Sequence, residues 1–374
     1  MKDIFQCYAS AAFGLEGLVA SELRSLGYFT DVSAGNGGVR FSSDAVSLFI
    51  CNLSMHFSDR IYIILHEGTC TSFEQLFNMV SSIDWQTYFN HDDSIDVSCK
   101  CTRSKLMSPR DCQSITKKAI IEKLKKTRNQ KTFPECGTSL SIHLSVRNDF
   151  ASILLNTSGN ALSRRGYRTW NGEAPLRETL ASALIHLSGW HSGQPLHDPF
   201  CGTGTILDEA AMIAADMVPG GNRSFLMESY KLFQHLDFDA LRTSQLTKSR
   251  PENIRQISGS DIDPAALDLA KRHFHQAGIN ESAVILKQIP LQELMLSETH
   301  GVFICNPPYG ERLGDQKQCR VLYHDLHLLK QRHPTWRLCA ISSDPAFERS
   351  YGKKADRKRR LYNGRLECVF YIYD

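Results

Sequence analysis

The chain has 374 residues, which is more than one compact core usually organises, so we expect two or three domains. Hydrophobic residues make up 42% of the chain and charged residues 22%, which excludes wholesale disorder. No stretch reaches the roughly 18 uninterrupted apolar residues of a membrane span, and Gln6 and Glu16 interrupt the most apolar part of the N-terminus. We therefore expect no membrane span, no signal peptide and a cytoplasmic location.

The twelve cysteines are scattered along the chain and do not form a compact framework. The closest pair is Cys99-Lys-Cys101, and no histidine cluster lies near it, whereas structural zinc sites usually need two closely spaced ligand pairs. We therefore predict free, mostly buried thiols in a reducing compartment and no metal site.

The first region, residues 1–68, alternates strand, helix and turn signals. An apolar run at residues 5–9 predicts a strand, and leucines at helical spacing over residues 15–26 predict a helix that Gly27 ends. Three glycines then predict a turn before the strand-like Val39-Arg40-Phe41. This pattern is typical of a small α+β unit.

The second region extends to about Asn156 and alternates in the same way. Apolar and polar residues alternate over residues 95–99, which predicts a half-buried strand. A helix is predicted over residues 112–126, followed by further strands at 140–146 and 152–155. The pattern predicts a second α+β unit.

Positive charge gathers in two places. Between Lys100 and Lys131 there are eleven Lys or Arg residues against only Asp111 and Glu122, and residues 353–360 hold six more. Basic clusters indicate a polyanionic partner, although a solvated helix face explains either cluster alone. The candidate ligands of such a polyanion on the predicted helix are Lys117, Lys118, Lys125 and Lys126.

Beyond residue 157 the pattern changes. Residues 157–175 are predicted to form a connector, after which short apolar strands alternate with helices. The strands are expected at residues 196–197, 254–260, 284–286, 302–305, 338–341 and 366–373, with helices at 206–217 and 264–277. Such alternation predicts parallel strands joined by right-handed crossovers, in a doubly wound α/β sheet.

A glycine-containing loop, Asp198-Pro-Phe-Cys-Gly-Thr-Gly-Thr205, follows the first of these strands. Gly202 and Gly204 lack the Cβ atoms that would hold the backbone away from a ligand, at the place where doubly wound folds bind nucleotides. Leu207 replaces the third glycine of a pyrophosphate loop, and a ligand-facing Asp198 would repel pyrophosphate. S-adenosylmethionine, which carries an ammonium and a sulfonium but no phosphate, fits better.

The next strand ends at Asp261, whose carboxylate can accept hydrogen bonds from both hydroxyls of a ribose. Asp263 and Pro264 then predict a helix start, with Asp263 as the N-cap and Pro264 at the first helical position. We therefore predict that Asp261 binds ribose and that Asp263 is mainly structural.

The segment Asn306-Pro-Pro-Tyr309 follows another apolar strand and is the sharpest chemical signal in the chain. The prolines fix their own φ, restrict the residues before them and leave carbonyl oxygens as backbone acceptors. The Asn306 side-chain oxygen and the Pro307 carbonyl can hold the two N–H bonds of an aromatic amine, while Tyr309 stacks on its ring. This pattern predicts methyl transfer to an exocyclic amine by positioning, with no covalent enzyme intermediate.

Together, these two segments resemble the class I amino-methyltransferases. Arg165-Gly-Tyr-Arg168 and Ala174-Pro-Leu-Arg-Glu-Thr-Leu180 narrow the resemblance to bacterial THUMP-domain methyltransferases of the large-subunit rRNA guanine-N2 type. The resemblance covers nearly the whole chain, and further matching segments are Gly37-Gly-Val-Arg-Phe41, Asn52-Leu53, Asp59-Arg60, Lys117-Lys-Ala-Ile120 and Leu361-Tyr-Asn-Gly364.

The resemblance implies a domain order. It places a ferredoxin-like α+β region at residues 1–65, a THUMP RNA-binding region at 66–157 and a connector at 158–175. Residues 176–374 would form a Rossmann-like class I methyltransferase domain, doubly wound around a mostly parallel seven-stranded sheet.

The resemblance also implies site residues. The catalytic residues would be Asn306, Pro307, Pro308 and Tyr309, and Arg165 and Arg168 would join the lysines in binding structured RNA. The ligands of S-adenosylmethionine would be Asp198, Pro199, Cys201, Gly202, Gly204, Thr205, Asp261, Ile262, Gln288 and Thr179. Gln288 stands where an acidic residue is expected beside the adenine, which leaves adenine recognition open.

We predict transfer of a methyl group to the N2 of a guanine, in 23S rRNA, and no obligate protein partner is evident. A tRNA substrate and an N6-adenine DNA methyltransferase stay open, because both kinds of base present the same two N–H bonds. The strand-rich N-terminal half favours RNA over DNA, since a DNA enzyme needs a domain that reaches the major groove. A non-catalytic RNA-binding assembly protein is a third alternative, which the filled catalytic positions disfavour.

Overall fold

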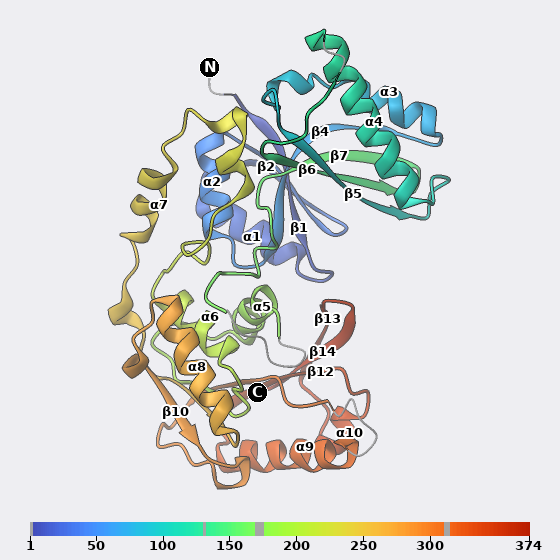
Figure 1. The fold of residues 1–374 in the computed structure, drawn as a ribbon. Helices are drawn as coiled ribbons and strands as arrows, with labels where there is room; N and C mark the ends of the chain where they lie inside the picture. The colour runs from blue at the N-terminus through green and yellow to red at the C-terminus, as the bar shows by residue number, and fades with distance from the viewer. Residues whose placement is uncertain (1–2, 130–131, 169–175, 310–314) are drawn as a thin grey trace.

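The computed structural model describes residues 3–129, 132–168, 176–309 and 315–374, which form two seven-stranded sheets with packed helices (Figure 1). The N-terminal sheet has the order β2-β3-β1-β4-β7-β6-β5. Its strands are β1 (Phe5–Ala11), β2 (Thr30–Gly35), β3 (Gly38–Ser43), β4 (Ser58–Thr69), β5 (Ser94–Thr102), β6 (Ser139–Arg147) and β7 (Phe150–Asn156).

Strand β4 joins the two α+β units that the sequence predicts. It is 12 residues long and pairs antiparallel with β1 through one part of its length and with β7 through most of it. Both units therefore contribute to one continuous sheet, a connection that the separate sequence patterns did not predict.

One face of this sheet is apolar and the other is polar. Cross-strand partners Cys7 and Ile63, and Leu155 and Ile142, are all buried in one core together with residues of the four helices. The helices are α1 (Glu16–Leu26), α2 (Ala45–Ser54), α3 (Phe73–Ser82) and α4 (Pro109–Arg128). Since side chains alternate along a strand, the intervening residues lie on the face that these helices leave uncovered.

Local signals explain the helix ends. Gly27 takes the left-handed conformation at φ 73° and ends α1, as predicted. Helix α4 begins earlier than the predicted residue 112, because the Ser108 side chain caps it by accepting the Asp111 N–H and Pro109 occupies the first turn.

The second sheet has the order β10-β9-β8-β11-β12-β14-β13, with parallel pairing from β10 to β12 and antiparallel pairing beyond. Its strands are β8 (Leu196–Asp198), β9 (Ile257–Asp261), β10 (Val284–Gln288), β11 (Gly301–Cys305), β12 (Trp336–Ser342), β13 (Arg357–Asn363) and β14 (Leu366–Tyr373). The predicted doubly wound, mostly parallel seven-stranded sheet is confirmed.

Among the described residues, five helices pack beside this sheet: α5 (Glu178–Ser188), α6 (Thr205–Ala214), α8 (Pro264–Ala277), α9 (Asp315–Arg332) and α10 (Phe347–Tyr351). Helix α8 has its predicted bounds and its predicted cap, since Asp263 accepts the Ala265 N–H. Helix α6 was expected to continue to Met217 but ends at Ala214, because Asp216 adopts a left-handed φ of 50°.

Residues 218–255, between α6 and β9, form a strap against the N-terminal half (Figure 1). The strap contains α7 (Phe238–Leu246) and three short 3-10 turns, η2 (Leu226–Ser229), η3 (Lys231–Phe233) and η4 (Pro251–Asn253). The Phe49 ring of α2 packs against Phe225 and Phe238, with ring centroids 5.8 and 4.8 Å away. Arg223 donates to four connector carbonyls, those of Ser158, Asn160, Ala161 and Arg164.

The helices and the cysteines of the structure bear on the expectations about membrane spans and free thiols. Within the described part of the chain, every helix is too short or too polar to cross a membrane. All twelve cysteines carry free thiols and most of them are buried, as predicted.

Candidate functional site

The fold brings four predicted segments to one edge of the second sheet. The carboxyl ends of neighbouring parallel strands meet at the same edge, which is where doubly wound folds bind ligands. Strand β8, which leads into the glycine loop, pairs directly with β11, which leads into Asn306, and on its other side with β9, which ends at Asp261. Gln288 at the end of β10 pairs in register with Asp261.

The two glycines of the loop have different roles. Gly202 has a φ of +50°, and a Cβ added there would meet no atom within 4 Å, so its backbone is open to a ligand. Gly204 has a φ of +85° at the N-cap of α6, and a Cβ there would lie 3.0 Å from that of Ala270. Gly204 therefore allows the turn and the close packing of α8, and Gly202 allows approach from outside.

The two aspartates beside the loop are placed differently. Asp198 was expected to face the ligand, but it is 2% exposed, accepts the Phe200 N–H at 3.0 Å, and its pKa is raised by burial. This expectation is corrected: Asp198 shapes the loop from beneath. Asp261 is half-buried and accepts the N–H groups of Gly202 and Asp263 at 2.8 and 3.0 Å, so it ties the second strand end to the loop.

The open side of the loop suits a nucleoside. Ile262 follows Asp261 and is 69% exposed, so it offers an apolar surface to a flat ring. The Gln288 amide is exposed and donates to the Ile262 carbonyl at 3.4 Å. An open glycine backbone, a carboxylate and an exposed aliphatic side chain fit the amino acid, ribose and adenine parts of S-adenosylmethionine.

Cys201 and Thr205, also predicted as cofactor ligands, pack inward. A Cβ on Gly259 of β9 would lie 2.8 Å from that of Cys201, so the small side chains there let the loop approach the strand. Burial raises the pKa of the Cys201 thiol, which makes it a packing residue and a poor nucleophile. Thr205 accepts a hydrogen bond from the Arg168 guanidinium.

The Asn-Pro-Pro-Tyr segment leaves a strand that is buried along its whole length. The Tyr323 hydroxyl of α9 donates to the Pro308 carbonyl at 2.9 Å, which anchors the second proline. The Tyr309 hydroxyl donates to the Asn306 Oδ1, and burial raises the pKa of Tyr309. Tyr309 therefore covers the Asn306 Oδ1 atom, so any other group that donates to this oxygen has to exchange that hydrogen bond.

Arg165 and Arg168 were predicted to contact RNA, and this prediction is wrong. Arg165 is 2% exposed, pairs with Glu209 at 3.1 Å and donates to the carbonyls of Met55 and His56. Arg168 pairs with Glu178 at 3.2 Å, and the side chains of both are less than a tenth exposed. These arginines hold the connector and the end of α2 against the second domain.

Glu209 is the centre of this buried cluster and was missed by sequence reasoning. Its carboxylate accepts from Arg165, from the Tyr167 hydroxyl at 3.1 Å and from the Ser182 hydroxyl. The neighbouring Asp208 is also buried, and burial and the Glu209 charge raise its pKa. The sequence signal that could have indicated this cluster is the adjacent acidic pair Asp208-Glu209, on an apolar helix that follows the glycine loop.

Thr179, predicted as a cofactor ligand, turns towards the N-terminal half. Its hydroxyl donates to Asp59 at 3.3 Å, and Asp59 lies 3.8 Å from Arg177. Together with Phe13 and Tyr362 these residues line a cavity of about 340 Å³. The cavity lies where the N-terminal half, α5 and the β13–β14 hairpin meet.

The predicted lysines lie on α4, on the outer side of the N-terminal sheet. Lys117 pairs with Glu135 at 2.8 Å and Lys118 pairs with Glu122 at 3.7 Å. Lys126 is exposed and Lys125 is half-buried. Two of the four charges therefore have acidic neighbours, which weakens the helix as an electrostatic surface.

A basic surface on the uncovered face of the N-terminal sheet was not predicted, although one of its residues, Lys100, begins the basic cluster at residues 100–131. The uncovered face of the N-terminal sheet carries a groove of about 940 Å³, which we call the sheet-face groove. Lys100 and Arg147 are exposed along it, and Phe150 is 44% exposed at its edge. An aromatic row runs through it, with ring centroids 6.4 Å apart for Tyr8 and Tyr62 and 5.7 Å apart for Tyr62 and His143.

Family models match three consecutive parts of the chain: the RlmL ferredoxin-like domain at residues 6–62, the THUMP domain at 70–156 and the RMKL-like methyltransferase domain at 165–372. YpsC of Bacillus subtilis, named as a candidate RNA methyltransferase, is 35% identical over 98% of this chain and 94% of its own length. Ribosomal RNA large subunit methyltransferase K/L of Shewanella frigidimarina is 33% identical over 99% of this chain and 53% of its own length, so the chain spans about half of that relative.

Solved structures resemble the chain over its full length. One described as a predicted N6-adenine-specific DNA methylase from Listeria monocytogenes has a TM-score of 0.92 and 35% identity, covering 100% of this chain and 96% of that one. SMU.472, solved in complex with SAH, has a TM-score of 0.90 and 36% identity, covering 100% of this chain and 98% of that one. TrmN from Thermus thermophilus, at a TM-score of 0.69 and 16% identity over 99% of both chains, shares the fold.

Proposed function

The chain belongs to the RMKL-like methyltransferase family, and on that premise we propose that it methylates the exocyclic N2 of a guanine in 23S ribosomal RNA. The ribosomal RNA substrate is taken from the large-subunit methyltransferases K/L, which the chain matches over about half their length. The THUMP match and the sheet-face groove support an RNA substrate over DNA.

S-adenosylmethionine would supply the methyl group: the amine nitrogen would bond to the methyl carbon as the carbon–sulfur bond breaks. The sulfonium would leave as a neutral thioether, and the methylated amine would release one proton to solvent. We assign its ribose to Asp261, its adenine to Ile262 and Gln288, and its amino acid part to the backbone at Gly202. The exposed Ile262 and the open space at Gly202 support this assignment.

The protein's part in the reaction is to hold the amine. An exocyclic amine is a poor nucleophile because its lone pair is delocalised into the ring. If Asn306 Oδ1 and the Pro307 carbonyl accept its two N–H bonds, the lone pair is directed towards the methyl donor. Fixed acceptors of this kind act by positioning and electrostatic preorganisation.

The observation that most strongly supports methyl transfer at this site is that strands β8 and β11 are neighbours in the sheet. These strands pair through Leu196 with Val302 and His197 with Phe303, so the glycine loop and Asn306 leave the sheet side by side. A donor bound over the loop and an amine held by Asn306 would therefore meet without a large movement. Tyr309, which already touches Asn306 Oδ1, can turn from that oxygen to stack on the incoming base.

Comparison of RNA from a deletion strain with that from its parent tests the proposal. The rRNA and tRNA fractions are digested separately to nucleosides, and methylated nucleosides are quantified by mass spectrometry. We expect N2-methylguanosine to fall in 23S rRNA and to return when the wild-type chain, but not Asn306→Ala, is supplied. A loss confined to tRNA, or a loss of N6-methyladenosine, would contradict the proposal.

A further inference from the structure

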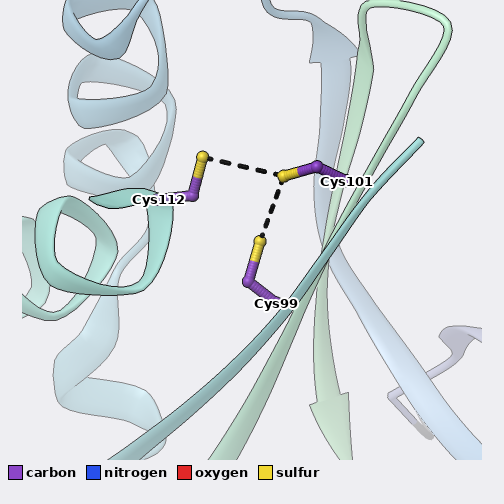
Figure 2. A group of neighbouring side chains, drawn as sticks. All are labelled: Cys99, Cys101 and Cys112. Atoms are coloured by element: carbon purple, nitrogen blue, oxygen red, sulfur yellow. Dashed lines mark hydrogen bonds between the residues drawn. The ribbon is translucent and has the colours of Figure 1, made fainter. Parts of the chain in front are cut away.

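Three cysteine side chains converge between a strand and a helix of the N-terminal half (Figure 2). The Sγ atoms of Cys99 and Cys101 lie 3.6 Å apart, and those of Cys101 and Cys112 lie 3.9 Å apart. All three sulfur atoms lie within 4.8 Å of one another. The group is remote in sequence from the glycine loop and the Asn-Pro-Pro-Tyr segment.

The fold explains why the three thiols meet. Cys99 and Cys101 are two residues apart on β5, so both point to the same face of the sheet. They pair in register with the buried Leu144 and Val146, on the face that α4 covers. Cys112 lies near the start of α4, and its side chain faces the two cysteines of β5 in Figure 2. The third thiol is therefore supplied by tertiary structure, which the sequence spacing does not reveal.

The sulfur positions match a metal geometry. A Zn–S bond of about 2.3 Å places the sulfur atoms of a tetrahedral site about 3.8 Å apart. Two of the three sulfur–sulfur separations, 3.6 and 3.9 Å, lie on either side of that value, and the third, between Cys99 and Cys112, is below 4.8 Å. Cys99 and Cys101 are half-buried while Cys112 is fully buried, so the group is open on its strand side.

The thiols also point at one another in place of other partners. The Cys101 Sγ atom lies within hydrogen-bond distance of both the Cys99 and the Cys112 Sγ atoms, so the three thiols can form S–H···S interactions within the group. Burial and the neighbouring thiols raise the pKa of Cys99, and burial and Cys101 raise the pKa of Cys112 to about 12. A divalent cation reverses this preference, since it binds the thiolate and displaces the proton.

We propose that Cys99, Cys101 and Cys112 bind one thiophilic divalent cation of the Zn²⁺ class, with water at the fourth position. Binding forms three metal–sulfur bonds and releases the thiol protons to solvent, with no change in oxidation state. Thiolates select such soft or borderline cations over Mg²⁺ and Ca²⁺. The bound cation would tie the start of α4 to β5, and so fix the helix that carries the basic residues Lys117 to Lys126.

Titration of the full-length, phosphine-reduced protein with Cd²⁺ tests the site, because cadmium thiolates absorb in the ultraviolet. We expect a thiolate-to-metal band that saturates at one equivalent and is displaced by excess Zn²⁺. Cys101→Ser and Cys112→Ser should weaken binding by at least about tenfold, since even a lost outer-shell partner costs 10–100-fold. The matched control is Cys136→Ser, because Cys136 is the exposed thiol outside the group.

A thermal melt separates loss of the site from loss of the fold. Zn²⁺ should raise the melting temperature of the wild type and of Cys136→Ser by mass action, and should raise that of Cys101→Ser clearly less above its own metal-free value. An absent Cd²⁺ band in the wild type, or an equal band in Cys101→Ser, would overturn the proposal. So would conversion of the group to a disulfide with no metal uptake under these reducing conditions.

Discussion

The two seven-stranded sheets of this protein present their chemistry in different places. The second sheet is mostly parallel and covered by helices, and its candidate residues lie at strand ends, from Asp198 to Asn306. The N-terminal sheet is mostly antiparallel and has one uncovered face, and its candidate residues lie along the strands, as in the sheet-face groove. Parallel sheets are usually buried on both sides, whereas antiparallel sheets can face solvent on one.

This difference governs what a sequence reveals. A site at strand ends is built from contiguous loops, so glycines, prolines and acidic residues stand together in the sequence. A site on a sheet face takes every second residue from several strands, so Lys100 and Arg147 are separated in sequence and share a surface only after folding. The first kind of site gives a recognisable segment and the second does not.

The largest effect should come from the buried pair of Arg165 and Glu209, which connects the two halves of the molecule. Arg165→Ala leaves a buried carboxylate without its charge partner, so we expect a loss of about 3–5 kcal/mol in the free energy of unfolding. Urea denaturation measures it. Arg164→Ala, at the exposed neighbouring position, should change stability by less than about 0.5 kcal/mol. Equal effects of the two variants would remove the pair as the link between the halves.

The strand-end site makes the next largest prediction. Asn306→Ala should lower the rate of methyl transfer about 10²–10³-fold, because one preorganised polar contact is lost. The affinity for S-adenosylmethionine, measured by calorimetry, should stay close to that of the wild type. A variant that keeps more than about a tenth of the wild-type rate would show that Asn306 does not hold the amine.

The buried histidine under the glycine loop makes stability depend on pH. His197 contacts the hydroxyls of Ser258 and Ser260 at 2.8 and 3.1 Å, and burial lowers its pKa from 6.5 to about 3. Below pH 6.5 this histidine is protonated in the unfolded chain, whereas in the folded chain it stays neutral down to about pH 3. The free energy of unfolding therefore falls as the pH falls from 6.5 to about 3.

A variant without this histidine should lose this pH dependence, which can be measured by unfolding the protein at several pH values. His197→Asn should flatten the dependence of unfolding free energy on pH by up to about 1.4 kcal/mol per unit between pH 6 and 4. The exposed His191 provides the control, and His191→Asn should keep the wild-type slope. Identical slopes for wild type and His197→Asn would contradict the assignment of a neutral, buried histidine.

The smallest effect should distinguish the two basic surfaces of the N-terminal half. Lys100→Ala with Arg147→Ala should weaken RNA binding and lower its salt slope by about 2, if each contacts one phosphate. Lys118→Ala with Lys126→Ala removes the same charge from α4 and should change the slope less. A larger effect of the α4 pair would assign RNA binding to the helix and not to the sheet-face groove.

Much of the second sheet could be predicted, because its elements carry local signals. Helix α8 begins and ends at its predicted residues, set by the Asp263 cap and by Gly278. The Asn-Pro-Pro-Tyr segment could be located from its local amino-acid sequence alone. The contact between Tyr309 and Asn306 could not, since it depends on how the tyrosine packs against α9 and β14.

The errors share one physical cause, which is burial by tertiary structure. Arg165 and Arg168 lie in a basic, glycine-rich stretch, and only the fold places Glu209 and Glu178 beside them. The same cause hides the meeting of Cys112 with the two cysteines of β5. Side-chain type indicates what a residue can bind, and the fold decides what reaches it.

The most direct test of guanine-N2 methylation is methyl transfer by the purified chain. The protein is incubated with S-adenosylmethionine carrying an isotopically labelled methyl group and with ribosomal RNA from a deletion strain, and the digested nucleosides are separated by mass spectrometry. We expect label in N2-methylguanosine from 23S rRNA with the wild type, and almost none with Asn306→Ala. Label in N6-methyladenosine, or in N2-methylguanosine from tRNA alone, would contradict it.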